Sequence, residues 1–213
     1  SFLKSKYKVA TLSRGYGRVS KGFVIADLQS TAQDIGDEPF QLFKKFKDIS
    51  VAVDADRLNG LDLLKKSKPS IEVVLLDDAF QHRKVSAGFN ILLTAYDQIY
   101  CHDYVLPTGN LREPKSGAKR AEAIVVTKSP ESLSQEHKFN IIEQLNPESN
   151  QEVFFSSIYY SDVLISLTSS RSVADLKAVR FTLVTGIANP APLVTHLKSI
   201  GLDFDHLEFK DHH

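Results

Sequence analysis

The sequence predicts an α/β protein in which helices flank a parallel sheet. Residues 49–53 have the pattern of a strand, residues 58–66 that of a helix, and residues 71–76 that of a second strand. This order is a βαβ unit, whose two strands run parallel and whose crossover is right-handed in nearly all proteins. The run Val73–Leu76, with Ile71 before it, is apolar, which is typical of an inner strand buried on both faces of a parallel sheet.

The first predicted strand covers residues 7–13, and the loop Arg14-Gly15-Tyr16-Gly17-Arg18 follows it. Glycine lets the backbone approach a ligand closely, and arginine binds phosphate through two parallel hydrogen bonds. Arg14 is therefore a candidate phosphate ligand. A surface turn with solvated arginines explains the same residues about equally well.

A further strand is predicted at residues 22–28, and a helix is predicted after Gly36-Asp37-Glu38-Pro39. Aromatic residues recur at helical spacing over residues 40–46, so Asp37 is the predicted N-cap, with Pro39 in the first turn. An aspartate at a helix start that faces strand ends can also act as a general base. Both interpretations of Asp37 stay open at this point.

Charged residues follow the two strands of the βαβ unit. Asp54-Ala55-Asp56-Arg57 comes after the first of them, and Asp77-Asp78 comes directly after the second. Asp77 and Asp78 fall at the carboxyl end of their strand, where open α/β sheets bind ligands. Carboxylates in this place commonly hold Mg²⁺ in enzymes that act on nucleotide phosphates. An aspartate that merely caps the turn after a strand is the alternative.

Two more strands are predicted at residues 89–94 and 122–127, followed by a helix at 132–145. Between the strands lies a long polar loop, residues 97–120, and a loop of this length inside a compact domain is usually functional or disordered. Its basic residues at 115–120 suit either phosphate or plain solvent. The sequence therefore marks this loop as a candidate part of a site.

The chain changes character after the polar segment 146–151. Residues 153–160 are rich in aromatic and β-branched side chains, which favour strands, and a late strand is predicted at 181–185. Asn189 is predicted to cap, and Pro190 to start, a helix through Ser199 whose backbone amides suit an anion. The chain closes with Asp211-His212-His213; the two histidines are a purification-tag remnant, or one is an imidazole oriented by Asp211.

Composition excludes several classes of protein. Lys plus Arg and Asp plus Glu both number 26, so no overall charge draws the chain to nucleic acid, and any such contact has to be local. The single cysteine, Cys101, excludes an internal disulfide and suits a reducing compartment such as the cytosol. No segment approaches the roughly 20 apolar residues of a membrane-spanning helix. Peripheral membrane contact stays open.

Seven segments together resemble the tetraacyldisaccharide 4'-kinase family. They are LSRGYGR (12–18), GDEP (36–39), LLDDAFQHR (75–83), LPTGNLREP (106–114), KRAEAIVVTK (119–128), TGIANP (185–190) and FKDHH (209–213). They occur in order over almost the whole chain. The resemblance implies a P-loop-kinase-like parallel sheet with flanking helices plus a smaller C-terminal α/β part. It assigns residues 1–150 to the core of a P-loop-type kinase domain and residues 151–213 to a strand-rich linker and the start of a second lobe.

The resemblance also implies an activity and its partners. The family phosphorylates the 4'-hydroxyl of the tetraacyl disaccharide 1-phosphate precursor of lipid A, with ATP and Mg²⁺ as cofactors. The expected partners are ATP, the lipid-linked disaccharide and the cytoplasmic face of the inner membrane of Gram-negative bacteria, which the protein would contact peripherally. No nucleic acid is expected.

Site residues follow by matching the family's motifs. Asp77 and Asp78 would meet Mg²⁺ and the phosphates, with His82 beside them. Asp37 would be the base on the sugar hydroxyl, with His212 as its orienting partner; His212 is chosen over His213 from its spacing after Asp211. The residues implied to line the phosphate and substrate cleft are Arg14, Arg57, Arg112 and Glu113.

One family element is absent from these residues. No G-x-x-x-x-G-K-[ST] loop occurs, so the chain resembles the middle of the enzyme and is expected to be inactive alone. The alternative is a non-catalytic nucleotide-sensing module of P-loop type, against which Asp37 argues, since a sensor needs no base directed at a hydroxyl group. A sugar-nucleotide binder of Rossmann type is weaker, because no G-x-G-x-x-G follows a strand.

Overall fold

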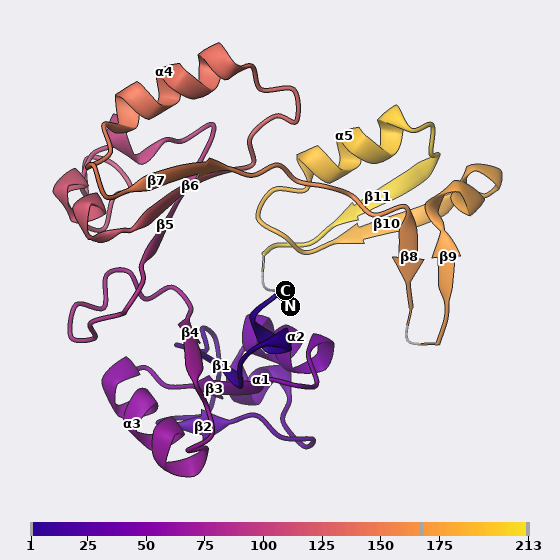
Figure 1. Cartoon of the computed structure of the whole chain (residues 1–213). Helices are drawn as coiled ribbons and strands as arrows, with labels where there is room; N and C mark the ends of the chain where they lie inside the picture. Colours follow the sequence, from indigo (N-terminus) through magenta and orange to yellow (C-terminus); the bar gives the residue numbers. More distant parts are fainter. Residues whose placement is uncertain (1, 167, 212–213) are drawn as a thin grey trace. The chain divides into compact units, whose positions relative to one another are not determined.

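The protein has an α/β fold with parallel sheets, seen in a computed structural model that describes residues 2–166 and 168–211 (Figure 1). The chain divides into two compact units, Ser1–Ile158 and Tyr159–His213. Among the described residues, the first unit contains two sheets and four α-helices, and the second contains two pairs of strands and one α-helix.

The first sheet has the strand order β2-β3-β1-β4. Its strands are β1 (Val9–Ser13), β2 (Val24–Ile25), β3 (Ser50–Val53) and β4 (Val73–Leu76). β1 pairs in parallel with both β3 and β4, whereas the short β2 pairs antiparallel with β3. The parallel pairing of the βαβ unit through β1 places the carboxyl ends of three strands at one edge of the sheet.

The structure corrects the prediction that β4 is an inner strand buried on both faces. β4 lies at the edge of its sheet and pairs only with β1 among the described strands, and Leu75 is 46% exposed. The strand that is buried at every position is β1. An apolar sequence permits a strand to be buried on both faces. Whether it is buried depends on its place in the sheet, because neighbouring elements have to cover it.

Three helices accompany the first sheet: α1 (Ala32–Ile35), α2 (Asp37–Lys45) and α3 (Arg57–Ser67). The core beneath them includes Leu12 of β1 and Leu64 of α3, both fully buried. Gly60 lets α3 approach β1, because a Cβ atom at this position would lie 3.0 Å from both methyl groups of Leu12. This close packing fixes the start of α3 beside the carboxyl edge of the sheet.

The start of α2 differs from the prediction that Asp37 is its N-cap. Gly36 is the N-cap, and Asp37 is the first residue of the helix. Gly36 has φ +92°, a conformation that favours glycine, and it ends α1 and begins α2. A Cβ atom at Gly36 would lie 2.9 Å from the carbonyl oxygen of Tyr16, so this helix start packs against the loop that follows β1.

The second sheet of the first unit is parallel throughout, with the order β5-β6-β7. It comprises β5 (Ile91–Ala95), β6 (Ala123–Thr127) and β7 (Glu152–Phe155), and α4 (Gln135–Leu145) connects the last two. Ile124, Val126, Ile141 and Leu145 form its buried core. We expected a boundary after residue 150, but β7 pairs with β6, so residues 151–158 stay with the first unit.

The long loop between β5 and β6 is held by local hydrogen bonds. It contains two short 3-10 helices, η2 (Tyr100–His102) and η3 (Lys115–Arg120). Asp103 accepts hydrogen bonds from the backbone N–H groups of Tyr104 and Asn110. The Gln151 side chain donates to two carbonyl oxygens around the end of η3. The loop therefore has a defined conformation that is able to carry site residues.

The second unit contains a βαβ unit formed by β10 (Phe181–Thr185), α5 (Ala191–Ser199) and β11 (Phe204–Glu208). The predicted late strand and the helix through Ser199 are confirmed, but the N-cap of the helix is Pro190 and not Asn189, whose side chain accepts a hydrogen bond from the N–H of Ala191. β11 was not predicted. A hairpin of β8 (Val163–Ile165) and β9 (Ser170–Ser172) precedes them, followed by the 3-10 helix η4 (Val173–Ala178).

Candidate active site

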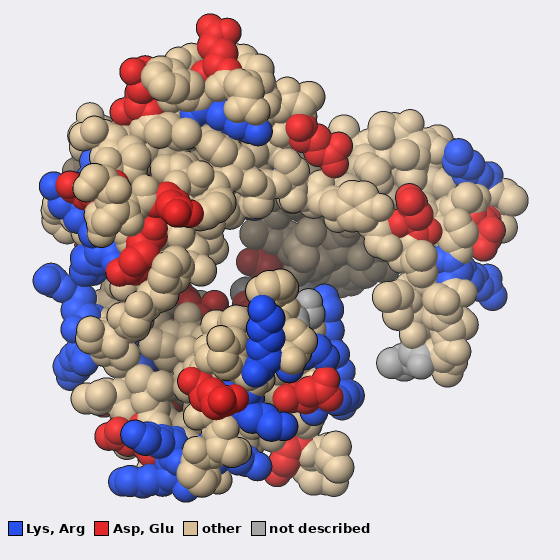
Figure 2. Space-filling view, in the orientation of Figure 1, with Lys and Arg blue, Asp and Glu red and all other residues tan. Residues whose placement is uncertain are grey.

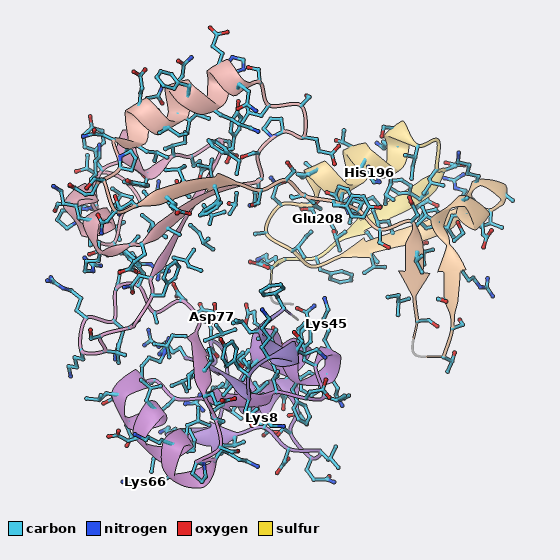
Figure 3. All side chains as sticks on the ribbon, viewed as in Figure 1. Lys8, Lys45, Lys66, Asp77, His196 and Glu208 are labelled. Carbon is cyan, nitrogen blue, oxygen red and sulfur yellow. The ribbon has the colours of Figure 1, made fainter. Side chains whose placement is uncertain are left out.

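Charged residues gather where the three parallel strands of the first sheet end. Ser13 pairs with Val53, and Leu12 pairs with Leu76, so Arg14, Asp54 and Asp77 each follow directly on neighbouring strands. Asp77 lies at the end of β4 (Figure 3). The predicted clustering of Arg14, Arg57 and Asp77 around this edge therefore has a structural cause, the shared direction of the strands.

Arg57 ties the ends of β3 and β4 together. It is only 4% exposed, and its Nη1 donates to the carbonyl oxygens of Asp54 at 3.1 Å and Ala55 at 3.2 Å. Its Nη2 makes a longer contact, 3.5 Å, with the carbonyl oxygen of Asp77. A buried guanidinium held by backbone oxygens supplies a fixed positive charge at this edge.

The electrostatic environment of Arg57 contains both signs of charge. Burial lowers the pKa of its guanidinium, and the nearby Arg14 lowers it further. Asp78, Asp77 and Asp54 act in the opposite direction and raise that pKa. One other cationic and three anionic side chains thus lie within electrostatic reach of Arg57, and charged groups with shifted pKa values of this kind cluster at functional sites.

Asp54 is a member of this cluster that the sequence analysis did not single out. It is 3% exposed, and its Oδ2 accepts a hydrogen bond of 2.7 Å from the side chain of Asn59. Its Oδ1 accepts from the N–H of Asp56, which in turn is the N-cap of α3. The sequence feature that could have identified Asp54 as a site residue is its position directly after β3, which matches that of Asp77 directly after β4. Asp54 shapes the turn that presents Arg57.

The neighbouring carboxylates of Asp77 and Asp78 have different surroundings. Asp78 adopts φ +44°, and its carboxylate forms an ion pair with Arg112 at 3.1 Å. Both partners are well exposed, 68% for Asp78 and 63% for Arg112, so the pair contributes little to stability. The Asp77 side chain is exposed and has no hydrogen bond or ion pair within the described residues. Asp77 is thus the carboxylate that remains available to a ligand.

The donor set at this edge fits Mg²⁺ bound together with phosphate. Mg²⁺ prefers oxygen donors and is usually held by one or two carboxylates, with substrate phosphates and water as the other ligands. Asp77 and Asp78 provide two such carboxylates. Within residues 2–166 and 168–211, no group of three or more His, Cys, Asp or Glu side chains is placed to hold a metal ion by itself. The residues therefore suit a shared site rather than a closed protein cage.

Three buried polar atoms lack hydrogen-bond partners in the described part of the chain. They are Ser13 Oγ, Arg57 Nε and His82 Nε2. Ser13 ends β1, Arg57 begins the helix after β3, and His82 follows β4. A buried polar atom without a partner costs about 1–3 kcal/mol, so such atoms are uncommon and mark functional sites. Ser13 and Arg57 lie at the carboxyl edge of the first sheet, and His82 lies in the loop that leaves this edge after β4.

Glu113 and Arg120 form a clamp around the loop that follows β4. The Nη2 atom of Arg120 lies 2.8 Å from Oε1 of Glu113 and donates to the carbonyl oxygen of Phe80 at 3.1 Å. The guanidinium also lies 4.6 Å from the centre of the Phe80 ring. The family resemblance implied Glu113 at the substrate cleft, and Arg120 was predicted only as one of the basic loop residues that suit either phosphate or solvent. The structure shows that Arg120 orients the Glu113 carboxylate.

We expect Arg120→Ala to lower the free energy of unfolding by about 2 kcal/mol, since it breaks a partly buried charged hydrogen bond. Amide exchange over residues 77–83 should rise as well. Lys119→Ala is the matched control, because Lys119 pairs with Glu148 at 2.6 Å but in an exposed setting. It should cost no more than roughly 0.5 kcal/mol. Urea denaturation and hydrogen exchange measure both; equal losses in the two variants would contradict the clamp.

Asp37 stands at the start of α2, next to the glycine loop that Arg14 begins. Gly15 makes this approach possible, because a Cβ atom there would lie 2.7 Å from the carbonyl oxygen of Ile35. The predicted partner, His212, and the alternative, His213, lie outside the described residues and in the second unit. The structure therefore leaves the Asp37–His212 pair as a prediction.

A comparison with protein-family models identifies the family of this chain. The family model described as tetraacyldisaccharide-1-P 4'-kinase matches residues 1–213. The chain belongs to this family. The resemblance seen in the seven motifs is thereby confirmed over the whole chain.

Relatives and a solved structure agree with the assignment. The tetraacyldisaccharide 4'-kinase of Flavobacterium johnsoniae is 49% identical over 211 residues, which cover 99% of this chain and 62% of the relative. That of Bacteroides thetaiotaomicron is 46% identical over 222 residues, covering 99% and 58%. The chain therefore spans about three fifths of these relatives.

A crystal structure of the "apo" form of LpxK from Aquifex aeolicus in complex with ATP is similar in fold. It has a TM-score of 0.77 and 32% sequence identity, and the match covers all of this chain and 64% of that one. This likeness confirms the predicted class, a P-loop-kinase-like α/β fold with parallel sheets and a smaller C-terminal α/β part.

Proposed function

We propose that this chain is the central part of an enzyme that transfers the γ-phosphate of ATP to the 4'-hydroxyl of tetraacyl disaccharide 1-phosphate, a step in lipid A biosynthesis. The names of the relatives supply the reaction, and the ATP in the similar crystal structure supplies the donor. The observation that carries the proposal is a set of buried atoms without partners among the described residues: Ser13 Oγ and Arg57 Nε at the carboxyl edge of the first sheet, and His82 Nε2 in the loop after β4.

Phosphoryl transfer requires mainly that charged groups be positioned and neutralised. Arg57 provides a buried positive charge and Arg14 an exposed one beside it, and both suit phosphate oxygens. Asp77 and Asp78 would hold Mg²⁺, which when bound would neutralise charge that develops on the phosphates. His82 would donate to or accept from the same ligand through its unpartnered nitrogen.

Arg112 and Glu113 extend the site from the loop between β5 and β6. Arg112 forms an ion pair with Asp78, and a bound phosphate would compete for the same guanidinium. Glu113 is held in place by Arg120. These contacts connect the loop between β5 and β6 with the residues that follow β4. A ligand that binds to one of these segments would therefore change the position of the other.

Asp37 would accept the proton of the sugar hydroxyl during transfer, with His212 of the second unit as its orienting partner. Residues 159–213 would therefore contribute to the reaction as the beginning of a second lobe. Among residues 2–166 and 168–211, no helix is both long and apolar enough to cross a membrane. We propose a peripheral contact with the cytoplasmic face of the inner membrane, where the lipid substrate resides.

The test uses the full-length protein and residues 1–213 side by side. With labelled ATP, Mg²⁺ and tetraacyl disaccharide 1-phosphate, the full-length protein should release a lipid that carries a second phosphate. Residues 1–213 should bind ATP weakly and show no turnover, since they lack the G-x-x-x-x-G-K-[ST] loop whose amides cradle phosphate. Calorimetry measures the binding.

Two results would speak against the proposal. ATP binding by the full-length protein without phosphate transfer to the lipid would favour the nucleotide-sensing alternative. Tight, Mg²⁺-dependent binding of ATP by residues 1–213 would place the cradle in residues 14–18 instead of in the remaining length that the relatives have.

A further inference from the structure

Lysine side chains sit on aromatic rings throughout two segments of the first unit, residues 2–7 and 40–47. Lys44 lies 5.0 Å from the ring centre of Phe40, and Lys47 lies 5.5 Å from that of Phe43. Such contacts occur about once per 70–80 residues in proteins. Their concentration in two short segments therefore needs an explanation. We call residues 2–7 and 40–47 together the basic aromatic region.

The two segments form one continuous surface. Phe46 follows the end of α2, and both Lys45 at 5.6 Å and Lys4 at 5.9 Å approach its ring. Lys4 also pairs with Asp48 at 2.7 Å, which fixes the amino-terminal segment against the end of α2. Lys4 and Lys45, which are far apart in the sequence, thus share the ring of Phe46.

The region has a strong local charge although the chain has none. Residues 2–7 and 40–48 contain five lysines and one acidic residue, Asp48, whereas Lys plus Arg and Asp plus Glu are equal at 26 each in the whole chain. Figure 2 shows blue side chains, with red ones among them, over the part of the molecule that α1 and α2 occupy in Figure 1. The partner of this surface should be anionic.

The aromatic residues of the basic aromatic region indicate that its anionic partner is a lipid surface and not a nucleic acid. Bases stack on open ring faces, but the rings of Phe40, Phe43 and Phe46 are half-buried, and each has a lysine over it. Phe2 and Tyr7 are exposed, at 76% and 45%, so apolar contact is available at the rim. Lysines around exposed aromatic residues are the composition of segments that lie on anionic bilayers.

We infer that the basic aromatic region is the surface through which the protein docks on a bilayer that contains anionic phospholipid. Lys44, Lys45 and Lys47 would face the phosphate groups, and Phe2 and Tyr7 would enter the interfacial layer. The lysines that cover the phenylalanine rings would move toward lipid phosphates and leave the rings in contact with acyl chains. A lysine near such a surface contributes a factor of about five in binding.

The orientation of α2 links this surface to the candidate site. Asp37 begins the nine-residue helix and Lys44 and Lys45 lie in its last turn, so about 14 Å separates the ends, at about 1.5 Å per residue. A bilayer at the carboxyl end would leave Asp37 near the depth of a large lipid head group. The docking surface deepens the peripheral membrane contact of the proposed function, and this link to Asp37 also rests on the proposed kinase reaction.

The chain contains a matched control for the lysines. Residues 44–47 read Lys-Lys-Phe-Lys at the end of α2, and residues 65–68 read Lys-Lys-Ser-Lys at the end of α3. Both sets of lysines are exposed. Figure 3 shows Lys45 and Lys66 at separate parts of the surface of the first unit. Only the first set is combined with aromatic rings.

The experiment measures flotation of the full-length protein with vesicles, without ATP or substrate. One set of vesicles is phosphatidylcholine, and the other is phosphatidylcholine and phosphatidylglycerol in equal parts. The wild type should bind the mixed vesicles only. The triple variant Lys44→Gln, Lys45→Gln, Lys47→Gln should bind them about 10²-fold more weakly. The triple variant Lys65→Gln, Lys66→Gln, Lys68→Gln should bind as the wild type does, and Lys→Arg at positions 44, 45 and 47 should retain binding.

Each contrary result overturns the inference. Equal losses in the two glutamine variants would mean diffuse charge attraction, and no loss in either would mean that another surface docks. Turnover with a detergent-dispersed substrate should be unchanged in the first variant; a loss there would assign its lysines to the phosphate of the substrate itself. Because vesicle binding needs no catalysis, it gives the same answer whether or not the kinase reaction of the proposed function is found.

Discussion

Replacement of Asp77 by alanine in the full-length protein should lower turnover on the order of 10³-fold, the upper range for loss of one preorganised charged group. Asp77 follows β4 directly, and its carboxylate has no hydrogen bond or ion pair to any described residue, whereas Asp78 is engaged by Arg112. The free carboxylate is the one that a Mg²⁺–phosphate ligand would meet. Initial rates over a range of Mg²⁺ concentrations measure the effect.

Two further variants make the Asp77 result specific. Asp77→Asn keeps the shape but weakens a hard oxygen ligand, so higher Mg²⁺ should restore part of its activity. Asp62→Asn removes an equal charge from an exposed position on α3 and should leave the rate unchanged. Wild-type activity of Asp77→Ala at every Mg²⁺ concentration would remove Asp77 from the metal site.

Asp37→Ala and His212→Ala should each lower turnover by about 10²–10⁴-fold in the full-length protein, with little change in ATP affinity. A base and its orienting partner act as a unit, so the double variant should be scarcely worse than either single one. Steady-state rates and ATP titrations with the four proteins measure the coupling. Glu38→Ala is the matched control, because it removes the same charge from the same first turn of α2.

The control separates chemistry from helix stability. A carboxylate in the first turn stabilises a helix by about 0.3–1 kcal/mol whatever its catalytic role. Glu38→Ala should therefore lose a little stability and no turnover. If Glu38→Ala and Asp37→Ala were equally slow, or if the Asp37 and His212 losses multiplied, Asp37 would be a helix-start residue and the pair would be abandoned.

The candidate site could be predicted in part because strand ends are visible in a sequence. Arg14, Arg57 and Asp77 each follow an apolar run, and parallel strands bring such positions to one edge. Asp54 follows the same rule, yet it was missed, since an aspartate in a turn before a helix has an ordinary capping explanation. Arg120 was noted only among the basic residues of its loop that suit phosphate or solvent, because its actual contacts, Glu113 and the carbonyl oxygen of Phe80, are set by the fold.

The sequence by itself determined the order and type of the main elements, the parallel direction of the strands and the edge at which charge collects. Those properties depend on local apolar periodicity and on the chirality of the βαβ crossover. The tertiary structure alone decided that β1 is the buried strand and that β4 lies at the edge of the sheet. Burial depends on which elements pack beside a strand, and the sequence of the strand itself does not specify them. The tertiary structure also decided that Asp78 is paired and Asp77 is not, since a side-chain pair 34 residues apart forms only when two loops have met.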